Sequence, residues 1–280
     1  VSTPNDTHCE LACAAMKAGK NVIVEKPVAM DGAQAELMAR TAQQCGVIFT
    51  VHQNRRWDKD YKIASQIVND GMVGKVYSVQ SRLHGSRGAM FGWRAEPEHG
   101  GGMIFDWGVH FTDQIMNLFG FDSIKSVFCK MVNVKTEDVE DYFFLVYDLK
   151  NGMHVQMEIG TWVLNPLPRW MILGDLGTAY INDFSRNGKI IKIEKSAEHS
   201  EAVVTGEGTP TRTFAPRPAD EVMTFELPDT PTDLREYYAN LRDAIEGKCE
   251  PIVKPCQVCA VMHVLDCAFE SVRTGKQVMI

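Results

Sequence analysis

The stretch that decides the fold is Asn21-Val22-Ile23-Val24-Glu25-Lys26-Pro27, a short apolar run that ends in two charges and a proline. An uninterrupted apolar run of this length is typical of a strand buried on both faces of a parallel sheet. Apolar and small residues recur at helical spacing on either side of it, over residues 7–18 and 29–45, and a second apolar run covers residues 47–51. Strands that alternate with helices of about a dozen residues predict parallel β-α-β units in residues 1–52.

Beyond His52 the pattern changes to strands that follow one another with few helices between them. The expected helices cover residues 58–69, 104–119, 234–246 and 255–273, and the expected strands cover residues 75–84, 124–134, 141–149, 153–160, 169–173, 178–182 and 189–194. Asn151-Gly152 between two of these strands is a hairpin signal, and the polar stretch from Ser196 to Asp220 predicts a long exposed loop. We therefore expect an α/β protein whose partial parallel sheet is followed, over residues 53–280, by an α+β domain with an open, mainly antiparallel sheet.

Composition and charge exclude several classes of protein. The chain has 280 residues, of which 45% are hydrophobic and 23% charged, a balance typical of a globular protein with a sizeable core. The formal net charge is −7, and Lys and Arg are scattered rather than clustered, so we expect no nucleic-acid partner and no membrane surface. No apolar run approaches the ~20 residues that span a bilayer, and the first residues carry no secretion signal. We expect a cytoplasmic protein.

The eight cysteines are expected to be reduced in such a protein. Cys256, Cys259, His263 and Cys267 are spaced by three, four and four residues, which places all four on one helical face. This spacing admits a zinc or redox site, but apolar residues surround the four and the sequence has no second Cys-x-x-Cys pair. We therefore predict small buried thiols and no metal site.

Lys26 is the first candidate for chemistry. Glu25-Lys26-Pro27 lies at the carboxyl end of the first predicted strand, where open α/β sheets bind their ligands. Pro27 ends the strand and disfavours helical geometry at Lys26, so that the ammonium group can project into the crevice. An ordinary solvated lysine in a strand-to-helix turn is the alternative that the tripeptide alone leaves open.

A second candidate site follows a run of three glycines. Gly100-Gly101-Gly102 removes side chains from a loop, which permits the close approach of a ligand. In the helix predicted directly after it, Asp106 and His110 are four residues apart and can meet on one face. A carboxylate beside an imidazole orients the ring and raises its basicity, as a general base near neutral pH requires. A surface Asp–His pair without a catalytic role is the alternative.

Four segments in this order resemble the Gfo/Idh/MocA family, whose namesakes include glucose–fructose oxidoreductase and inositol dehydrogenase. They are Thr3-Pro4-Asn5-Asp6-Thr7-His8, the stretch from Ala18 into Glu25-Lys26-Pro27, Asn54-Arg55-Arg56-Trp57-Asp58 with Trp93-Arg94, and the triple glycine with Asp106-x-Gly-x-His110. The segment from Asn54 to Asp58 is most similar to a branch that includes NADP-dependent scyllo-inositol dehydrogenases. The resemblance covers essentially the whole chain and implies the second half of a Rossmann domain over residues 1–52 and a substrate and oligomerisation domain over residues 53–280.

The resemblance also implies an activity and residue roles. Similar proteins transfer a hydride between NAD or NADP and a hydroxyl or keto group of a sugar or cyclitol. Carried over to this sequence, Lys26 contacts the reacting hydroxyl, Asp106 positions the sugar and His110 is the acid/base. The cofactor-binding residues are expected to be Thr3, Pro4, Asn5, His8, Glu25, Lys26, Trp93 and Arg94. A redox-assisted glycosidase and a catalytically idle sugar-binding regulator of the same family are the alternatives.

One part of the family pattern is not found in this sequence. The family begins with a strand and a Gly-x-Gly-x-x-Gly loop that binds the pyrophosphate, and the residue that selects NAD or NADP lies in the same part. We therefore expect the natural protein to carry about 65–75 further residues at its front, about half of a Rossmann domain. This chain alone is expected to bind NAD(P) weakly.

The open sheet is expected to mediate self-association. Met157, Ile159, Trp170 and Ile172 place apolar side chains on its strands, and an exposed apolar patch usually marks a partner surface. We expect a homodimer or homotetramer packed through the uncovered face of this sheet.

Overall fold

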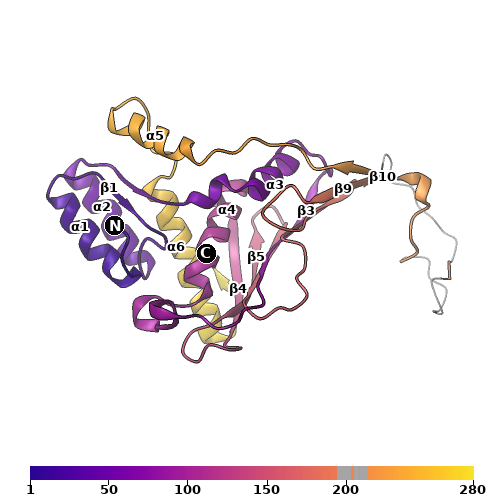
Figure 1. Ribbon diagram of the computed structural model, residues 1–280, viewed down its shortest axis with the longest axis horizontal. Helices are drawn as coiled ribbons and strands as arrows, with labels where there is room; N and C mark the ends of the chain where they lie inside the picture. Colours follow the sequence, from indigo (N-terminus) through magenta and orange to yellow (C-terminus); the bar gives the residue numbers. More distant parts are fainter. Residues whose placement is uncertain (194–202, 205–207, 209–213) are drawn as a thin grey trace.

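The computed structural model describes residues 1–193, 203–204, 208 and 214–280, and two sheets organise this part of the chain (Figure 1). The α-helices are α1 (His8–Lys17), α2 (Gly32–Cys45), α3 (Lys59–Asn69), α4 (Val109–Phe119), α5 (Arg235–Ile245) and α6 (Pro255–Thr274). The strands are β1 (Val22–Val24), β2 (Phe49–Val51), β3 (Val76–His84), β4 (Ile124–Val132), β5 (Tyr142–Leu149), β6 (His154–Gly160), β7 (Trp170–Gly174), β8 (Gly177–Ile181), β9 (Gly188–Ile193), β10 (Val222–Glu226) and β11 (Val278–Met279). The loop predicted from Ser196 to Asp220 falls mostly outside the described residues. None of the helices in the described ranges has both the length and the apolar composition needed to cross a bilayer.

Strands β1 and β2 form the parallel sheet that the sequence predicts, with α1 and α2 packed against each other beside it. Val1 lies along β1, because its amino group donates to the Ile23 carbonyl at 2.6 Å and its carbonyl accepts from the Glu25 N–H at 2.9 Å. Parallel strands end at the same edge of a sheet. The residues that follow β1 and β2 therefore meet, and His52 Nδ1 lies 2.9 Å from Glu25 Oε1.

Within the described residues, the second sheet has nine strands in the order β10-β9-β8-β7-β3-β6-β5-β4-β11. Strands β3 and β6 pair parallel, and the other neighbouring strands pair antiparallel. The Asn151-Gly152 turn connects β5 to β6, which confirms the predicted hairpin. The edge strands β10 and β11 are not among the elements predicted from the sequence. In β10 the alternation of apolar and polar residues is weak, and β11 has only two residues, so these strands are recognised by their pairing, β10 with β9 and β11 with β4.

Helices cover one face of this large sheet, where α3 packs on β7 and β8 and α6 packs on β4 (Figure 1). Met157, Ile159, Trp170 and Ile172 point to this covered face, since each is at most 1% exposed. The Trp170 indole donates to the carboxylate of Asp60 on α3 at 2.8 Å. The expectation that these four residues supply the open face is therefore wrong. Alternation determines which residues share a face but not which face the helices cover.

The open face carries the alternate residues of the same strands. Directly paired residues of neighbouring strands lie on one face, and the pairing continues from β5 across β6, β3, β7 and β8 to β9. The apolar side chains on this face include Phe144, Val146, Met171, Leu173 and Ile191, each of them half-buried or exposed. The sheet therefore presents an uncovered, partly apolar surface.

The helix predicted from Ile104 begins instead with one π-helical turn. Ile104–Gly108 is π-helical, and α4 starts at Val109. A Cβ on Gly108 would lie 3.0 Å from the Ile104 side chain and 3.1 Å from the ring of Phe143 on β5, so the glycine lets this turn pack on the sheet. Because a π-helical turn closes i→i+5 hydrogen bonds, residues four apart across it no longer stack as the α-helical spacing predicts.

Candidate active site

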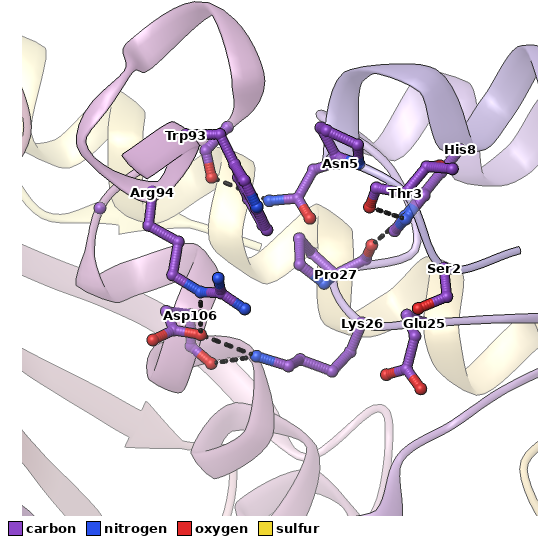
Figure 2. A pocket seen from close by; sticks show the side chains of 13 residues that line it. Ser2, Thr3, Asn5, His8, Glu25, Lys26, Pro27, Trp93, Arg94 and Asp106 are labelled. Carbon is purple, nitrogen blue, oxygen red and sulfur yellow. Dashed lines mark hydrogen bonds and ion pairs between the residues drawn. The ribbon is translucent and has the colours of Figure 1, made fainter. Parts of the chain in front are cut away.

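A cavity of about 410 Å³ opens at the carboxyl end of β1 (Figure 2). The residues that line it are Ser2, Thr3, Pro4, Asn5, His8, Glu25, Lys26, Pro27, Trp93, Arg94, Gly100, Gly102 and Asp106. The structure thus brings all eight residues that the resemblance assigns to the cofactor around one cavity. Sequence reasoning did not single out Ser2 as a lining residue, although it directly precedes the Thr3-Pro4-Asn5 segment.

His8 supports the wall of this cavity and has no nitrogen left for a ligand. The side chain is fully buried. Its Nδ1 lies 2.9 Å from the Pro27 carbonyl oxygen, and its Nε2 lies 3.0 Å from the Thr3 carbonyl oxygen. The imidazole therefore ties together the two backbone segments that flank the cavity, one of which contains the cis peptide bond between Lys26 and Pro27.

The three glycines are required by contacts within the protein. A Cβ on Gly100 would lie 2.9 Å from Asn5 Nδ2, which donates a hydrogen bond to the Gly100 carbonyl at 2.8 Å. A Cβ on Gly101 would lie 2.5 Å from the Arg94 carbonyl oxygen. Gly100 and Gly102 line the cavity. However, the lack of a side chain at Gly100 and Gly101 primarily allows neighbouring segments of the protein, rather than a ligand, to pack closely against this loop.

Lys26 and Arg94 converge on Asp106 at one side of the cavity (Figure 2). Lys26 Nζ donates to the Asp106 carbonyl at 2.7 Å and to the carboxylate Oδ1 at 3.0 Å, and Arg94 Nε lies 3.6 Å from the same Oδ1. Burial lowers the pKa of Lys26, and the Asp106 carboxylate opposes this shift. The Lys26 side chain is 17% exposed, so a largely buried ammonium group faces the cavity.

His110 is not among the residues that line this cavity. Its Nδ1 lies 3.3 Å from Gln53 Oε1, and no hydrogen bond joins it to Asp106 among the described residues. Burial lowers the pKa of His110 well below 6.5, and the positive charges of Lys26 and Arg55 add to the shift. The predicted Asp106–His110 pair and its raised basicity are therefore wrong, because the π-helical turn directs the carboxylate to Lys26.

A buried carboxyl group that sequence reasoning missed holds the start of the turn that carries Asp106. Glu140 Oε1 accepts a hydrogen bond from the Ile104 N–H at 2.8 Å, and the Glu140 carbonyl accepts one from the Met103 N–H at 3.0 Å. Burial raises the pKa of Glu140 to about 7. Glu140 and Ile104 are 36 residues apart, so no local spacing in the sequence could identify this contact.

A second cavity, of about 640 Å³, adjoins the first, and Asp106 and Arg94 line both. Residues 83–91 form one wall of it, and residues 159–161 at the end of β6 form another. Met103 and Trp107, on either side of Asp106 in the sequence, complete the lining. Asp106 therefore stands between two spaces in which ligand groups can bind.

The cysteine cluster on α6 differs in part from the prediction. Cys267 is buried, but Cys256 and His263 are exposed and Cys259 is half-buried. The expectation of a buried thiol is wrong for Cys256, because the first turn of α6 lies at the surface. Within the described ranges, no group of three or more His, Cys, Asp or Glu side chains is placed to hold a metal ion.

Two family descriptions match this chain. Residues 1–53 match the oxidoreductase family with an NAD-binding Rossmann fold, and residues 61–180 match the GFO/IDH/MocA C-terminal domain. The solved structure of an NAD-binding protein from Listeria innocua superposes on 100% of this chain and 80% of its own, with a TM-score of 0.94 and 35% identity. The predicted fold class, a Rossmann-type parallel sheet followed by a large, mainly antiparallel open sheet, is confirmed.

Curated relatives of this chain are named as oxidoreductases. The uncharacterized oxidoreductase YdgJ of Escherichia coli (strain K12) is 28% identical over 98% of this chain and 78% of its own length. The scyllo-inositol 2-dehydrogenase (NADP(+)) IolW of Bacillus subtilis (strain 168) is 31% identical over 53% of this chain and 41% of its own length. Together with the cavity at the end of β1, these matches establish that the chain belongs to the Gfo/Idh/MocA family of oxidoreductases, with an NAD-binding Rossmann fold in its first part.

Proposed function

We propose that this protein is an NAD(P)-dependent dehydrogenase that transfers a hydride between the nicotinamide and a hydroxyl or keto group of a sugar or cyclitol. The observation that carries the proposal is the convergence of Lys26 and Arg94 on Asp106 beside the cavity. An alcohol oxygen gains negative charge as its proton leaves, and cations beside a carboxylate stabilise that charge and orient the hydroxyl. The relative named for scyllo-inositol and NADP(+) supports this substrate class and leaves NAD and NADP both open.

The cavity fits the nicotinamide end of such a cofactor. It lies at the carboxyl end of a parallel strand, where Rossmann sheets bind dinucleotides, and Gly100 and Gly102 leave part of its wall without side chains. Glu25, whose side chain is 41% exposed, offers carboxylate oxygens to ribose hydroxyls. The Arg94 guanidinium stacks on the Trp93 ring at 4.4 Å to form another wall. When bound, the cofactor accepts or supplies the hydride.

His110 is the residue to which the family resemblance assigns the proton of the substrate hydroxyl. Its lowered pKa keeps the ring neutral near neutral pH, so that it is free to accept a proton, but also makes it a weaker base than an exposed histidine. Gln53 Oε1 is an acceptor beside Nδ1, which favours the tautomer that carries its hydrogen there and leaves Nε2 free to take a proton. In the proposed reaction, Lys26 and Asp106 bind and polarise the hydroxyl, and His110 holds the proton at Nε2.

Turnover by the full-length protein tests this proposal. The protein is mixed with NAD+ or NADP+ and a panel of sugars and inositols, and reduced nicotinamide is followed by its absorbance. Lys26→Met and His110→Ala are expected to lower kcat/KM at least about a hundredfold, whereas Lys20→Met, at an exposed position, is the matched control that should keep it. Wild-type turnover by the His110→Ala variant at neutral pH would show that another group is the base.

We also propose that the protein forms a homodimer or homotetramer through the open face of the nine-stranded sheet. A second copy placed about a two-fold axis would cover the apolar side chains of this face, such as Phe144, Met171 and Ile191. Light scattering at micromolar concentration is expected to give a dimer or tetramer, and Ile191→Lys, at a 38% exposed position, should weaken it. A monomeric wild-type protein would remove this proposal.

A further inference from the structure

The second cavity lies directly beside the proposed reaction site and is larger than the cofactor cavity. Its volume is about 640 Å³, against about 410 Å³ for the first, and Asp106 and Arg94 line both. A group bound at Asp106 therefore has direct access to the second cavity. Cavities of about 300–1,000 Å³ hold ligands of drug size, which are larger than a single sugar ring.

The wall of this cavity is mainly apolar, although several polar side chains also line it. Leu83 and Ile159 come from the ends of the paired strands β3 and β6, and Met103 and Trp107 flank Asp106. A sugar hydroxyl placed against these side chains would exchange its hydrogen bonds to water for none, which costs free energy. An apolar group in the same place gains free energy in proportion to the area it buries.

Some polar groups of the strand ends in this wall have partners within the protein. His84 Nδ1 accepts a hydrogen bond from the Leu167 N–H at 3.2 Å, and His84 Nε2 faces a carboxylate oxygen of Glu158 at 3.6 Å. The Gly85 N–H donates to the Gly160 carbonyl at 2.8 Å. Thr161 Oγ1, in the same lining, is buried without a hydrogen-bond partner among the described residues, so the wall offers one polar contact beside its mainly apolar surface.

An exposed aromatic ring stands in the lining of the same cavity. Phe91 is 83% exposed, although a phenylalanine gains by burial, and its neighbour Met90 also lines the cavity. Large apolar side chains exposed around a concave surface mark ligand sites. The flat ring of Phe91 suits a second aromatic ring, since aromatic pairs prefer stacked or edge-to-face contact.

We infer that the substrate is a glycoside whose sugar ring binds at Lys26 and Asp106 and whose apolar, preferably aromatic, aglycone lies in the second cavity. The inference rests on the proposed function, which places the reacting hydroxyl at Lys26. The second cavity takes no part in hydride transfer; it determines which sugar derivative is accepted.

The test compares a matched series of sugars, each offered as the free sugar, the methyl glycoside and the 4-nitrophenyl glycoside, to the full-length protein with NAD+ and with NADP+. We expect kcat/KM for a nitrophenyl glycoside to exceed that for its methyl glycoside at least about tenfold, because the aryl group buries more apolar area. Phe91→Ala should reduce this ratio several-fold. Leu164→Ala, which truncates a 74% exposed leucine outside the cavity lining, is the matched control and should leave the ratio unchanged.

The outcomes separate this inference from the proposed function. Equal kcat/KM for methyl and nitrophenyl glycosides would overturn the inference and leave a dehydrogenase. If no sugar is oxidised, thermal stabilisation by nitrophenyl but not methyl glycosides would support the aglycone site and overturn the proposed reaction. Release of nitrophenolate without net reduction of nicotinamide would also support the site, with a redox-assisted glycosidase in place of the dehydrogenase. The absence of both oxidation and stabilisation would overturn both.

Discussion

Replacing Gly102 with alanine tests how firmly the turn that carries Asp106 is held. Gly102 has φ +100°, and a Cβ there would overlap the carboxylate of Glu140. The Glu140 carboxylate has to shift to avoid the new methyl group, and we expect this shift to break its hydrogen bond from the Ile104 N–H, which is 2.8 Å long. We therefore expect Gly102→Ala to destabilise the protein and to displace Asp106 from Lys26.

Two effects add up in this variant. Alanine at a positive φ costs about 1–2 kcal/mol relative to glycine. When Glu140 moves to relieve the overlap, the Ile104 N–H is left without its acceptor, which costs about 1–3 kcal/mol. The free energy of unfolding should fall by about 2–5 kcal/mol, which is a substantial part of the roughly 5–15 kcal/mol that stabilises a typical domain.

Gly19→Ala is the matched control for the backbone effect. Gly19 has φ +73° and no atom within 4 Å of an added Cβ, so its replacement should cost only about 1–2 kcal/mol. Urea unfolding followed by circular dichroism measures both variants, and Gly102→Ala should be the less stable by about 1–3 kcal/mol. Equal stability of the two variants would refute the reasoning, because Glu140 would then not restrain Gly102.

Three further predictions concern buried charges. The raised pKa of Glu140 gives a stabilising contribution that is complete below pH 4.5 and is lost as the pH rises through about 7. Over this pH range, urea unfolding should show that the wild type loses roughly 3 kcal/mol of unfolding free energy relative to Glu140→Gln. An equal pH dependence of the two proteins would contradict the prediction. Asp113→Ala leaves the Arg56 guanidinium, now bonded to Asp113 at 2.6 and 2.7 Å, buried without its partner, and should lower the free energy of unfolding by about 3–5 kcal/mol. Glu36→Ala, which breaks an exposed ion pair, is its control and should cost less than about 1 kcal/mol. Because the pKa of His110 is lowered, kcat/KM for alcohol oxidation should stay level as the pH falls through 6.5 and decline only at lower pH; a decline centred above pH 6.5 would indicate a different base.

The secondary structure follows from the sequence where its periodicity is strong. The helix predicted over residues 255–273 is observed as Pro255–Thr274, because the proline at its start, its apolar face and Gly275 at its end all favour a helix with these bounds. The parallel pairing of β3 with β6 could not be predicted in this way. It joins residues such as Ser78 and His154, which are 76 positions apart and meet only through the topology of the whole sheet.

In the candidate site, too, the sequence predicts the residues that local structure positions and misses those that depend on long-range contacts. Glu25 and Lys26 reach the cavity because a parallel strand ends just before them, which the sequence shows directly. The contact of Lys26 with Asp106 spans 80 positions, and only the family resemblance placed the two residues at one site. Gln53 and Glu140 were missed, because their roles consist of single contacts with His110 and Ile104 that no spacing or composition marks.

The separation of Asp106 from His110 bears on the proposed reaction. With its carboxylate directed at Lys26, Asp106 balances a buried cation, and His110 is left among positive charges that favour its neutral form. If Asp106 faced His110 instead, the ring would be protonated more readily before the substrate binds, and Lys26 would lose the partner that holds its ammonium group. The π-helical turn over Ile104–Gly108 thus favours the charge distribution that the proposed reaction needs, with Lys26 as the cation that would bind the hydroxyl and His110 as the neutral ring that would take its proton.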